Sequence, residues 1–357
     1  MKNNKTKNFI LTLCFAVLGA LLFSILGIPV PWLLGSLAAT LLFSSFSISA
    51  PVFPSKLRDI SIMIVGYSMG LSFTRESMIQ MGSSLPYMLT FTLLLIVFCA
   101  LTAKIISKMT GIDYPSILVG SIPGGLSQIL VFAEEAKGIN LTVVTFLQVT
   151  RVIMIVITVP FLLFGPLFHQ SAAMSYSAAV SETGNYLLLL IYVPAAILFT
   201  LIGKRIKSPT PYLLGPLAAT ALLGLTGLDA ASIPTIVLDL AQLCIGCYVG
   251  LLLKPKQLKN KRRIFILAIV SSLVLIGGSI LMSLGLSHIL HFSPPTSFLS
   301  LAPGGMDQMA IMAHEVNADL SVVTSYQLFR LFFIYFIVPP FLKWLFGRLS
   351  HERAENC

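Results

Sequence analysis

Long apolar runs restrict the fold of this chain more than any other feature of its sequence. Each run has about the 20 residues that a helix needs to cross roughly 30 Å of hydrocarbon. Only 10% of the residues are charged, whereas a soluble domain carries roughly a quarter. The period-2 pattern of a membrane barrel is absent, which leaves helices as the structures that satisfy their own backbone in lipid. We therefore expect an all-α polytopic membrane protein. Four of the runs are Phe9 to Gly27, Pro86 to Ala103, Tyr186 to Gly203 and Ile264 to Leu286.

The net charge of +10 reports membrane topology rather than a nucleic-acid partner. Basic residues gather at the ends of apolar runs, at positions 2–7, 204–207 and 254–263. Such clusters are typical of loops that stay in the cytoplasm. The 254–263 cluster could also bind anionic lipid or RNA, but we expect no nucleic-acid partner. The first apolar run lacks a nearby small-residue cleavage site, so we interpret it as a retained helix.

An internal repeat divides the chain into two halves. Residues 31–40 (PWLLGSLAAT) and 211–220 (PYLLGPLAAT) are identical at 8 of 10 positions, at an offset of 180. Further on, a one-residue deletion changes the offset to 179. Repeats of this kind predict a duplicated architecture, with one membrane repeat at 1–170 and another at 180–350. The matching pairs include Asp59 and Asp239, Gly66 and Gly246, Gly70 and Gly250, Pro123 and Pro303, Gly124 and Gly304, Gly125 and Gly305, Gln128 and Gln308, Glu135 and Glu315, Gln148 and Gln327, and Arg151 and Arg330.

Each half contains six apolar segments, and their charge pattern bears on topology. If all six cross the membrane, both halves point the same way, and the 254–263 cluster faces outward, against the charge rule. If the fifth segment enters and leaves on one side, nearly all basic residues face the cytoplasm and only Arg75 lies outside. The second alternative predicts inverted repeats with about ten spanning helices and two broken segments. The expected segments are 9–28, 31–47, 57–73, 84–107, 114–134 and 141–168, followed by 185–203, 211–228, 235–253, 263–290, 295–314 and 320–347.

A Pro-Gly-Gly sequence interrupts the fifth segment of each half. Proline removes a backbone donor and glycine permits a turn, so the segment should break there and restart as a helix. Broken helices in transporters bind solutes with their freed backbone groups. A plain kink or a turn outside the membrane is the alternative. The candidate solute-binding residues at the breaks are Pro123, Gly124, Gly125, Ser127, Gln128, Pro303, Gly304, Gly305, Asp307 and Gln308.

The sixth segment of each half places a glutamine and an arginine on one helix face. These residues are Gln148 and Arg151, and Gln327 and Arg330. Both arginines precede long apolar runs, and a charge within the membrane usually faces a cavity or a partner. One interpretation is a pair of cationic anchors for an anionic solute. The other is a buried ion pair with Glu135 and Glu315 or with Asp59 and Asp239.

Carboxylates near the breaks are candidates for binding a coupling ion. The alternative for neighbouring Glu134 and His314 is a position in a hydrated turn. No metal site is expected, because the five histidines are scattered, and packing is the better interpretation of the Cys244-x-x-Cys247 pair. The candidate ion-coupling residues are Asp59, Glu135, Asp239, Asp307 and Glu315.

The duplicated PGG-[LM]-[SD]-Q segments, each followed by V-V-T-x-x-Q and an arginine, resemble the bacterial membrane AbrB family over nearly the whole chain. That family is internally duplicated, and its members are labelled as regulators of gene expression or as ammonia monooxygenase. A fainter likeness to cation/proton antiporters and bile-acid-type symporters covers Gly27 to Leu41 and Leu57 to Phe73. In those families the broken helix crosses the membrane.

These observations predict a secondary transporter of a small anionic or polar organic solute, coupled to H⁺ or Na⁺. Scattered histidines speak against a copper or iron monooxygenase, and we expect no enzyme activity and no cofactor. The alternative is a membrane-bound regulator that affects gene expression indirectly, without transport. The expected location is the bacterial cytoplasmic (inner) membrane with both termini in the cytoplasm. Expected partners are the bilayer and the solute, with homo-oligomer formation left open.

Overall fold

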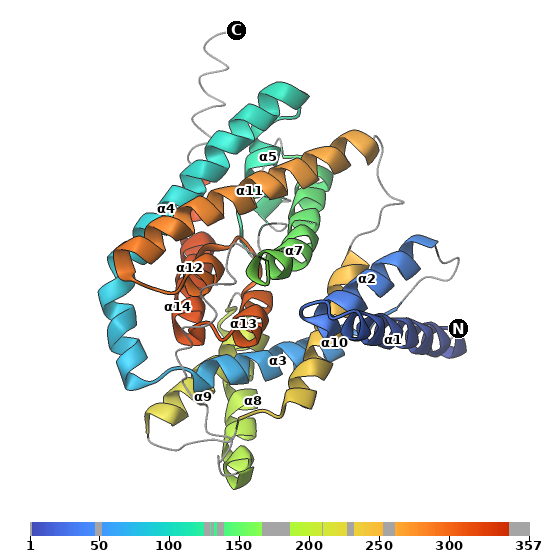
Figure 1. The fold of residues 1–357 in the computed structure, drawn as a ribbon, viewed down its shortest axis with the longest axis vertical. Helices are drawn as coiled ribbons and strands as arrows, with labels where there is room; N and C mark the ends of the chain where they lie inside the picture. Colours follow the sequence, from blue (N-terminus) through green and yellow to red (C-terminus); the bar gives the residue numbers. More distant parts are fainter. Residues whose placement is uncertain are drawn as a thin grey trace.

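The structure, a computed structural model, describes residues 2–46, 52–124, 129, 132–133, 139–165, 186–208, 210–226, 232–252 and 261–342. The described residues form helices and no strand (Figure 1). The first half contains α1 (Lys2–Ile25), α2 (Pro31–Phe46), α3 (Ser55–Leu71), α4 (Arg75–Thr110), α5 (Tyr114–Ser121) and α7 (Leu141–Leu163). The second contains η1 (Tyr186–Leu188), α8 (Leu189–Arg205), α9 (Pro211–Leu225), α10 (Thr235–Leu252), α11 (Lys261–Leu290), α12 (Pro294–Leu301), α13 (Met306–Glu315) and α14 (Leu320–Phe336).

Five described helices are long and apolar enough to cross a membrane. Shorter apolar helices at Pro31–Ser45, Pro211–Leu225 and Leu320–Phe336 accompany them. Large apolar side chains such as Leu18 and Leu190 are exposed at 62% and 75%, as expected for helices that face lipid. The all-helical membrane fold is confirmed, while the number of about ten crossings stays a prediction. The five are Thr6–Ile25, Arg75–Thr110, Leu141–Leu163, Thr235–Leu252 and Phe265–Leu290.

Helix α4 begins earlier than the predicted segment, at Arg75 instead of residue 84. Thr74 and Ser77 form a capping box: the Ser77 backbone N donates to Thr74 Oγ1 (3.2 Å), and the Thr74 backbone N donates to Ser77 Oγ (2.9 Å). This cap stabilises a polar first turn that hydropathy alone does not reveal. The helix ends at Gly111, whose φ of 70° gives the left-handed C-cap.

The two halves exchange equivalent contacts through their paired glycines. A Cβ on Gly70 of α3 would lie 1.7 Å from Thr220 Oγ1 of α9, and one on Gly250 of α10 would lie 2.2 Å from Thr40 Oγ1 of α2. Small residues let membrane helices approach this closely. Thr220 Oγ1 also donates to the Tyr67 carbonyl (3.3 Å). The repeated glycines therefore lie in two equivalent interfaces between the halves. In one, α3 of the first half packs on α9 of the second, and in the other, α10 of the second half packs on α2 of the first.

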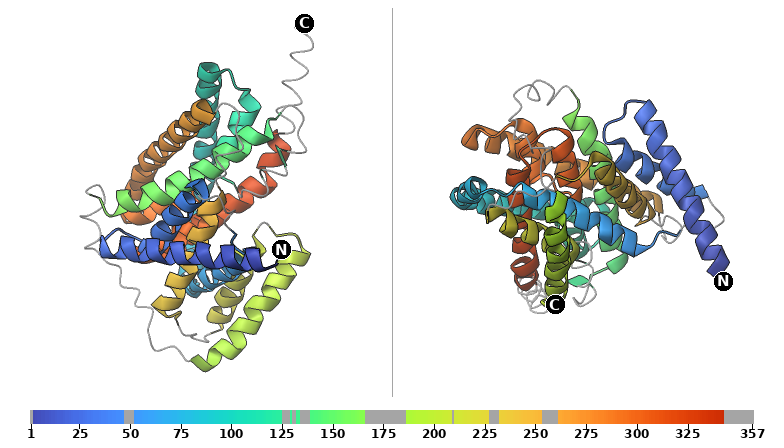
Figure 2. Two further views of the ribbon diagram at one scale, coloured as in Figure 1. Left: turned by 90° about the vertical axis from the view of Figure 1, so that its right-hand side faces the viewer. Right: turned by 90° about the horizontal axis from the view of Figure 1, so that it is seen from below.

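Helices α4 and α11, which are equivalent in the two halves, run in opposite directions. Gly278 of α11 faces Phe98 of α4, and Gly285, farther along α11, faces Phe91, which lies earlier on α4. Figures 1 and 2 show these helices side by side, with the end of α4 near the start of α11. Phe98 and Gly278 occupy equivalent positions, 180 residues apart. The repeats are therefore related by an approximate two-fold axis across the helices, as the inverted arrangement requires.

The segment around each Pro-Gly-Gly break enters and leaves on one side of the bundle. Thr296 Oγ1, in the first turn of α12, accepts a hydrogen bond from the backbone N of Asp319, which caps α14 (3.1 Å). Ser116 Oγ accepts one from Asn140, the cap of α7, in the same way (2.6 Å). Each segment thus begins beside the helix that follows it. We call the described residues between 113 and 140 the first hairpin and residues 293–319 the second hairpin.

The hairpins reach about halfway through the bundle. Arg330, which contacts the tip of the second hairpin, lies ten residues beyond Leu320 on α14, a distance of about 15 Å along a helix. The hydrocarbon core is about 30 Å thick. Both breaks are therefore re-entrant, and the crossing helix implied by the antiporter likeness is not what the structure has.

Reporter fusions after Lys137 and Asn317 are expected to lie on opposite sides of the membrane. The antiparallel arrangement of α4 and α11 implies this result, because the two hairpins then open toward opposite faces. Alkaline phosphatase and fluorescent-protein fusions at the two positions would measure it in cells. Reporters that face the same side would overturn the inverted arrangement. Lys137 itself lies outside the described residues.

Candidate functional site

The short helices α5 and α12 end inside the bundle, where their last backbone carbonyls need partners from outside the helix. Each begins with a side-chain cap, in which Asp113 Oδ2 accepts from Ser116 N (2.9 Å) and Ser293 Oγ accepts from Thr296 N (3.4 Å). Each then runs for 8 residues and stops before the Pro-Gly sequence. The last four carbonyls of a helix have no partner within it and must bond elsewhere.

Gln148 and Arg151 of α7 supply donors for the first hairpin. Gln148 Nε2 donates to the carbonyls of Val119 and Ile122, at 3.0 Å each. Arg151 Nη1 donates to Ile122 (2.9 Å) and Ser121 (3.3 Å), and its Nη2 donates to Gln148 Oε1 (2.8 Å). Both side chains are buried. The glutamine and the arginine predicted on one face of this helix thus bond to the carboxyl end of α5.

Gln327 and Arg330 of α14 do the same in the second hairpin. Gln327 Nε2 donates to the carbonyls of Leu299 (2.6 Å) and Ala302 (3.2 Å). Arg330 Nη1 donates to Ala302 (2.8 Å), its Nη2 donates to Gly304 (3.1 Å), and Nη2 also contacts Gln327 Oε1. A cation at the carboxyl end of a helix is also favoured by the helix dipole.

Neither arginine forms the ion pair that was one of the two alternatives. Among the described residues one ion pair is present, between Arg58 Nη2 and Asp59 Oδ1 at 2.7 Å. Glu315 instead accepts from Gln242 Nε2 at 3.0 Å. The ion-pair hypothesis is therefore wrong for Asp59, Asp239 and Glu315, because the arginines take backbone carbonyls as partners. Glu135 lies outside the described residues.

Each hairpin tip contacts a helix of the other half in the middle of the bundle. A Cβ on Gly124 would lie 2.9 Å from Ile334 Cγ2 of α14, and one on Gly304 would lie 3.0 Å from Ile155 Cγ2 of α7. Each tip therefore touches the other half, one helical turn beyond the arginine. The charges of Arg151 and Arg330 are close enough to repel one another. Two cationic groups thus face one central region.

Cys99 of α4 belongs to this centre, although the sequence did not indicate it. Its Sγ donates to the Ser121 carbonyl (3.7 Å), and it interacts electrostatically with both arginines. A lone cysteine in an apolar helix gives no signal by which it could be recognised. Cys244 and Cys247 are free thiols, with Cys247 packed among Ala16, Ala20 and Leu243, in agreement with the packing interpretation.

The chain restarts as a helix after the second break, as predicted. Helix α13 carries Asp307 and Gln308 in its first turn, and Gln308 Nε2 donates to Asp307 Oδ2 (3.0 Å). Gly305 lies beside both side chains. Four predicted residues of the first hairpin lie outside the described residues: Gly125, Ser127, Gln128 and Glu135.

The ion-coupling candidates do not form one group. Asp59 is paired with Arg58, and Asp307 lies at the tip of the second hairpin. Asp239 of α10 and Glu315 at the end of α13 are close enough for their charges to repel, and Glu315 accepts a hydrogen bond from α10. Gln242 of α10 belongs with these two acids but was not predicted from the sequence. It is a single glutamine in an apolar helix, and the equivalent position in the first half is Ile62. This difference between the halves could have identified it.

Several buried polar atoms at the centre have no partner in the described part of the chain. They include Arg151 Nε, Ser121 Oγ and Gln308 Oε1. A buried donor without a partner costs about 1–3 kcal/mol. A polar ligand between the tips could satisfy the Arg151 Nε–H. No group of three or more histidine, cysteine or acidic residues able to hold a metal occurs among the described residues.

Comparison with known proteins agrees with this architecture. The family model described as "Transition state regulatory protein AbrB" matches residues 1–126 and again residues 115–346. The chain is 26% identical to "Uncharacterized protein YhjN" of Bacillus subtilis (strain 168), over 99% of this chain and 97% of that protein. It is 24% identical to "Putative regulator AbrB" of Escherichia coli (strain K12), over 89% and 90%. Two matches of the family model cover nearly the whole duplicated chain, which therefore belongs to the AbrB family.

Proposed function

We propose that this chain is a secondary transporter of a small anionic or polar organic solute, coupled to H⁺ or Na⁺. The observation that carries the proposal is the pair of buried guanidinium groups at the tips of two opposed hairpins. Neither Arg151 nor Arg330 has a carboxylate partner among the described residues, and Arg151 Nε has no acceptor there. An anionic solute would supply both an acceptor and a counter-charge.

The inverted repeats support the same proposal. Two equivalent halves can exchange inward-facing and outward-facing shapes around a site near the midplane. In this chain each hairpin tip contacts the helix of the other half, so a movement of one half changes the surroundings of both arginines. The location that we propose is the bacterial cytoplasmic membrane, with both termini in the cytoplasm. The proposal involves no enzymatic step, no cofactor and no nucleic acid.

The name of the Escherichia coli relative, "regulator", favours a second candidate function. A membrane protein that regulates gene expression indirectly would bind a partner through its basic loop at 254–263 and move no solute. Pull-down with and without this loop, together with an absence of flux, would favour the regulator.

Flux measurements on purified protein test the transporter directly. Proteoliposomes that hold an imposed proton or sodium gradient are expected to accumulate one class of labelled solute from a panel of carboxylates, phosphates and neutral polar compounds. Liposomes without protein, and proteoliposomes with the gradient collapsed by an ionophore, are the controls. Equal uptake in all three preparations for every solute would contradict the proposal.

A further inference from the structure

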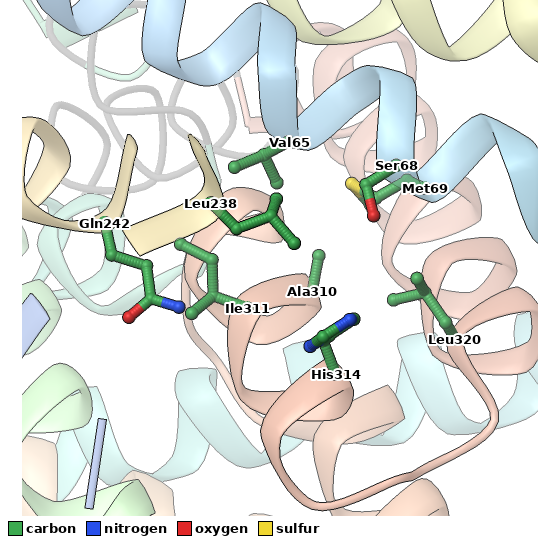
Figure 3. A pocket seen from close by; sticks show the side chains of 9 residues that line it. All are labelled: Val65, Ser68, Met69, Leu238, Gln242, Ala310, Ile311, His314 and Leu320. Carbon is green, nitrogen blue, oxygen red and sulfur yellow. The ribbon is translucent and has the colours of Figure 1, made fainter. Parts of the chain in front are cut away.

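A pocket lies between α3, α10, α13 and the start of α14 (Figure 3). Its cavity volume is about 20 Å³, room for about one water molecule. Figure 3 shows Gln242 and His314 among the side chains that line it, together with Ser68 and Leu238. Neither buried arginine lines it, so the pocket is separate from the centre between the hairpin tips.

The approximate two-fold symmetry predicts a matching pocket in the other half, but two large side chains occupy that position. Leu238 and Ser68 correspond to Arg58 and Tyr248 at the offset of 180. Arg58 Cζ lies 4.5 Å from the centroid of the Tyr248 ring, a cation–π contact between the halves. The same position is therefore open in one half and filled by a cationic side chain in the other.

Arg58, which fills this position in the first half, also pairs with the acidic residue next to it. In the first half Arg58 neutralises Asp59 across 2.7 Å. In the second half the equivalent Asp239 has Leu238 in place of the arginine. Its ionisable neighbours are Glu315, a second acid, and His314. Two nearby carboxylates without a fixed cation favour the binding of a positive charge.

Gln242 provides an independent indication of a ligand. The residue is 4% exposed and lines the pocket. Its Nε2 donates to Glu315 Oε1, while its Oε1 is buried and has no hydrogen-bond partner in the described residues. Buried amide oxygens rarely stay unpaired. An oxygen-rich group with a free carbonyl-type acceptor suits a hard cation or a proton rather than an anion.

We infer that Asp239, Gln242 and Glu315 form the coupling site of the proposed transporter, with Gln242 between the pocket, which it lines, and Glu315, to which it donates. The site binds one exchangeable positive charge, a proton or Na⁺, where the other half has Arg58 permanently in place. His314 is the remaining titratable group beside Asp239 and takes part when the bound charge is a proton. The inference rests on the proposed function for its role in coupling, whereas cation binding itself is independent of solute transport.

Binding measurements on the full chain in detergent test this inference. Binding of ²²Na⁺ by scintillation proximity, and the thermal unfolding midpoint across Na⁺ concentration and across pH 5 to 8, separate the two cations. We expect the wild type to respond to Na⁺, to proton concentration, or to both. Asp239→Asn and Glu315→Gln are expected to weaken that response by about tenfold or more, the equivalent of one lost charged hydrogen bond.

Two further variants use the symmetry of the chain. Leu238→Arg places the cation of the first half into the second, so it should abolish the response while the protein stays folded. Asp59→Asn, which alters the acid that is already paired with Arg58, should leave the response unchanged.

A wild type indifferent to both Na⁺ and pH, or an equal loss in Asp59→Asn and Asp239→Asn, would overturn the inference. Glu315 is exposed at the end of α13, so its variant remains informative if a buried one misfolds. A preparation that binds the cation but moves no solute would contradict the transporter and leave the cation site standing.

Discussion

Proteoliposomes that carry Arg151→Ala together with Arg330→Ala are expected to show solute flux at the background level. Arg151→Ala alone should lower the free energy of unfolding less than Arg330→Ala, because the Ile122 carbonyl keeps Gln148 and the Ser121 carbonyl keeps Cys99 as donors. Arg330→Ala alone should lower it by about 2–6 kcal/mol, because two carbonyls lose their donor and each costs about 1–3 kcal/mol. For Arg330 these are the carbonyls of Leu301 and Gly304, since Ala302 keeps Gln327 as a donor. Unfolding in detergent micelles and flux on the same preparations give both quantities.

Lysine variants distinguish the structural role of these arginines from a role in binding the solute. A lysine keeps the charge, but its single ammonium group cannot reproduce the planar fork that reaches several carbonyls at once. Arg330→Lys should therefore fold with intermediate stability and transport poorly. Arg75→Ala, at an exposed position in the first turn of α4, is the matched control and should change neither quantity. Normal flux in the folded double alanine variant would remove the arginines from the proposed solute site.

The second large effect is expected at the glycines that join the halves. A Cβ on Gly70 would lie 1.7 Å from Thr220 Oγ1 and 2.5 Å from the Leu217 carbonyl oxygen, and Gly250 has the equivalent contacts with Thr40 and Leu37. A backbone atom cannot give way without moving a whole helix. Gly70→Ala and Gly250→Ala are each expected to lower the free energy of unfolding by about 1–3 kcal/mol, as overpacking does in a close-packed core.

Gly224 and Gly277 offer matched controls within helices α9 and α11. A Cβ at either position would meet nothing within 4 Å. Alanine there should leave the protein unchanged or stabilise it by up to about 1 kcal/mol, because alanine is the better helix former. Unfolding midpoints of all four variants, measured in one detergent, make the comparison. If Gly70→Ala is as stable as Gly224→Ala, the close approach of α3 and α9 is not required by the fold.

Much of this architecture could be predicted from sequence because its signals are local. Apolar runs of membrane length, the Pro-Gly-Gly breaks and the repeated Gln-x-x-Arg spacing each follow from neighbouring residues. The helix after the second break also begins where predicted, with Asp307 in its first turn. Helix bounds were less accurate where a polar cap extended a helix beyond its apolar run, as Thr74 does for α4.

The sequence by itself determined that the chain is a duplicated, all-helical membrane protein with two interrupted segments and two buried arginines. Tertiary structure alone decided how these parts are partnered. The hydrogen bond from Asp319 to Thr296 makes the second break re-entrant, and the one from Asn140 to Ser116 does the same for the first. Arg151 and Arg330 bond to helix carbonyls instead of to carboxylates, because the ends of α5 and α12 lie within their reach. Equivalent positions in the two halves also differ, because Arg58 and Tyr248 fill one of them while a pocket beside Leu238 and Ser68 remains at the other. Contacts between residues nearly two hundred positions apart set this difference, and local sequence patterns do not encode such contacts.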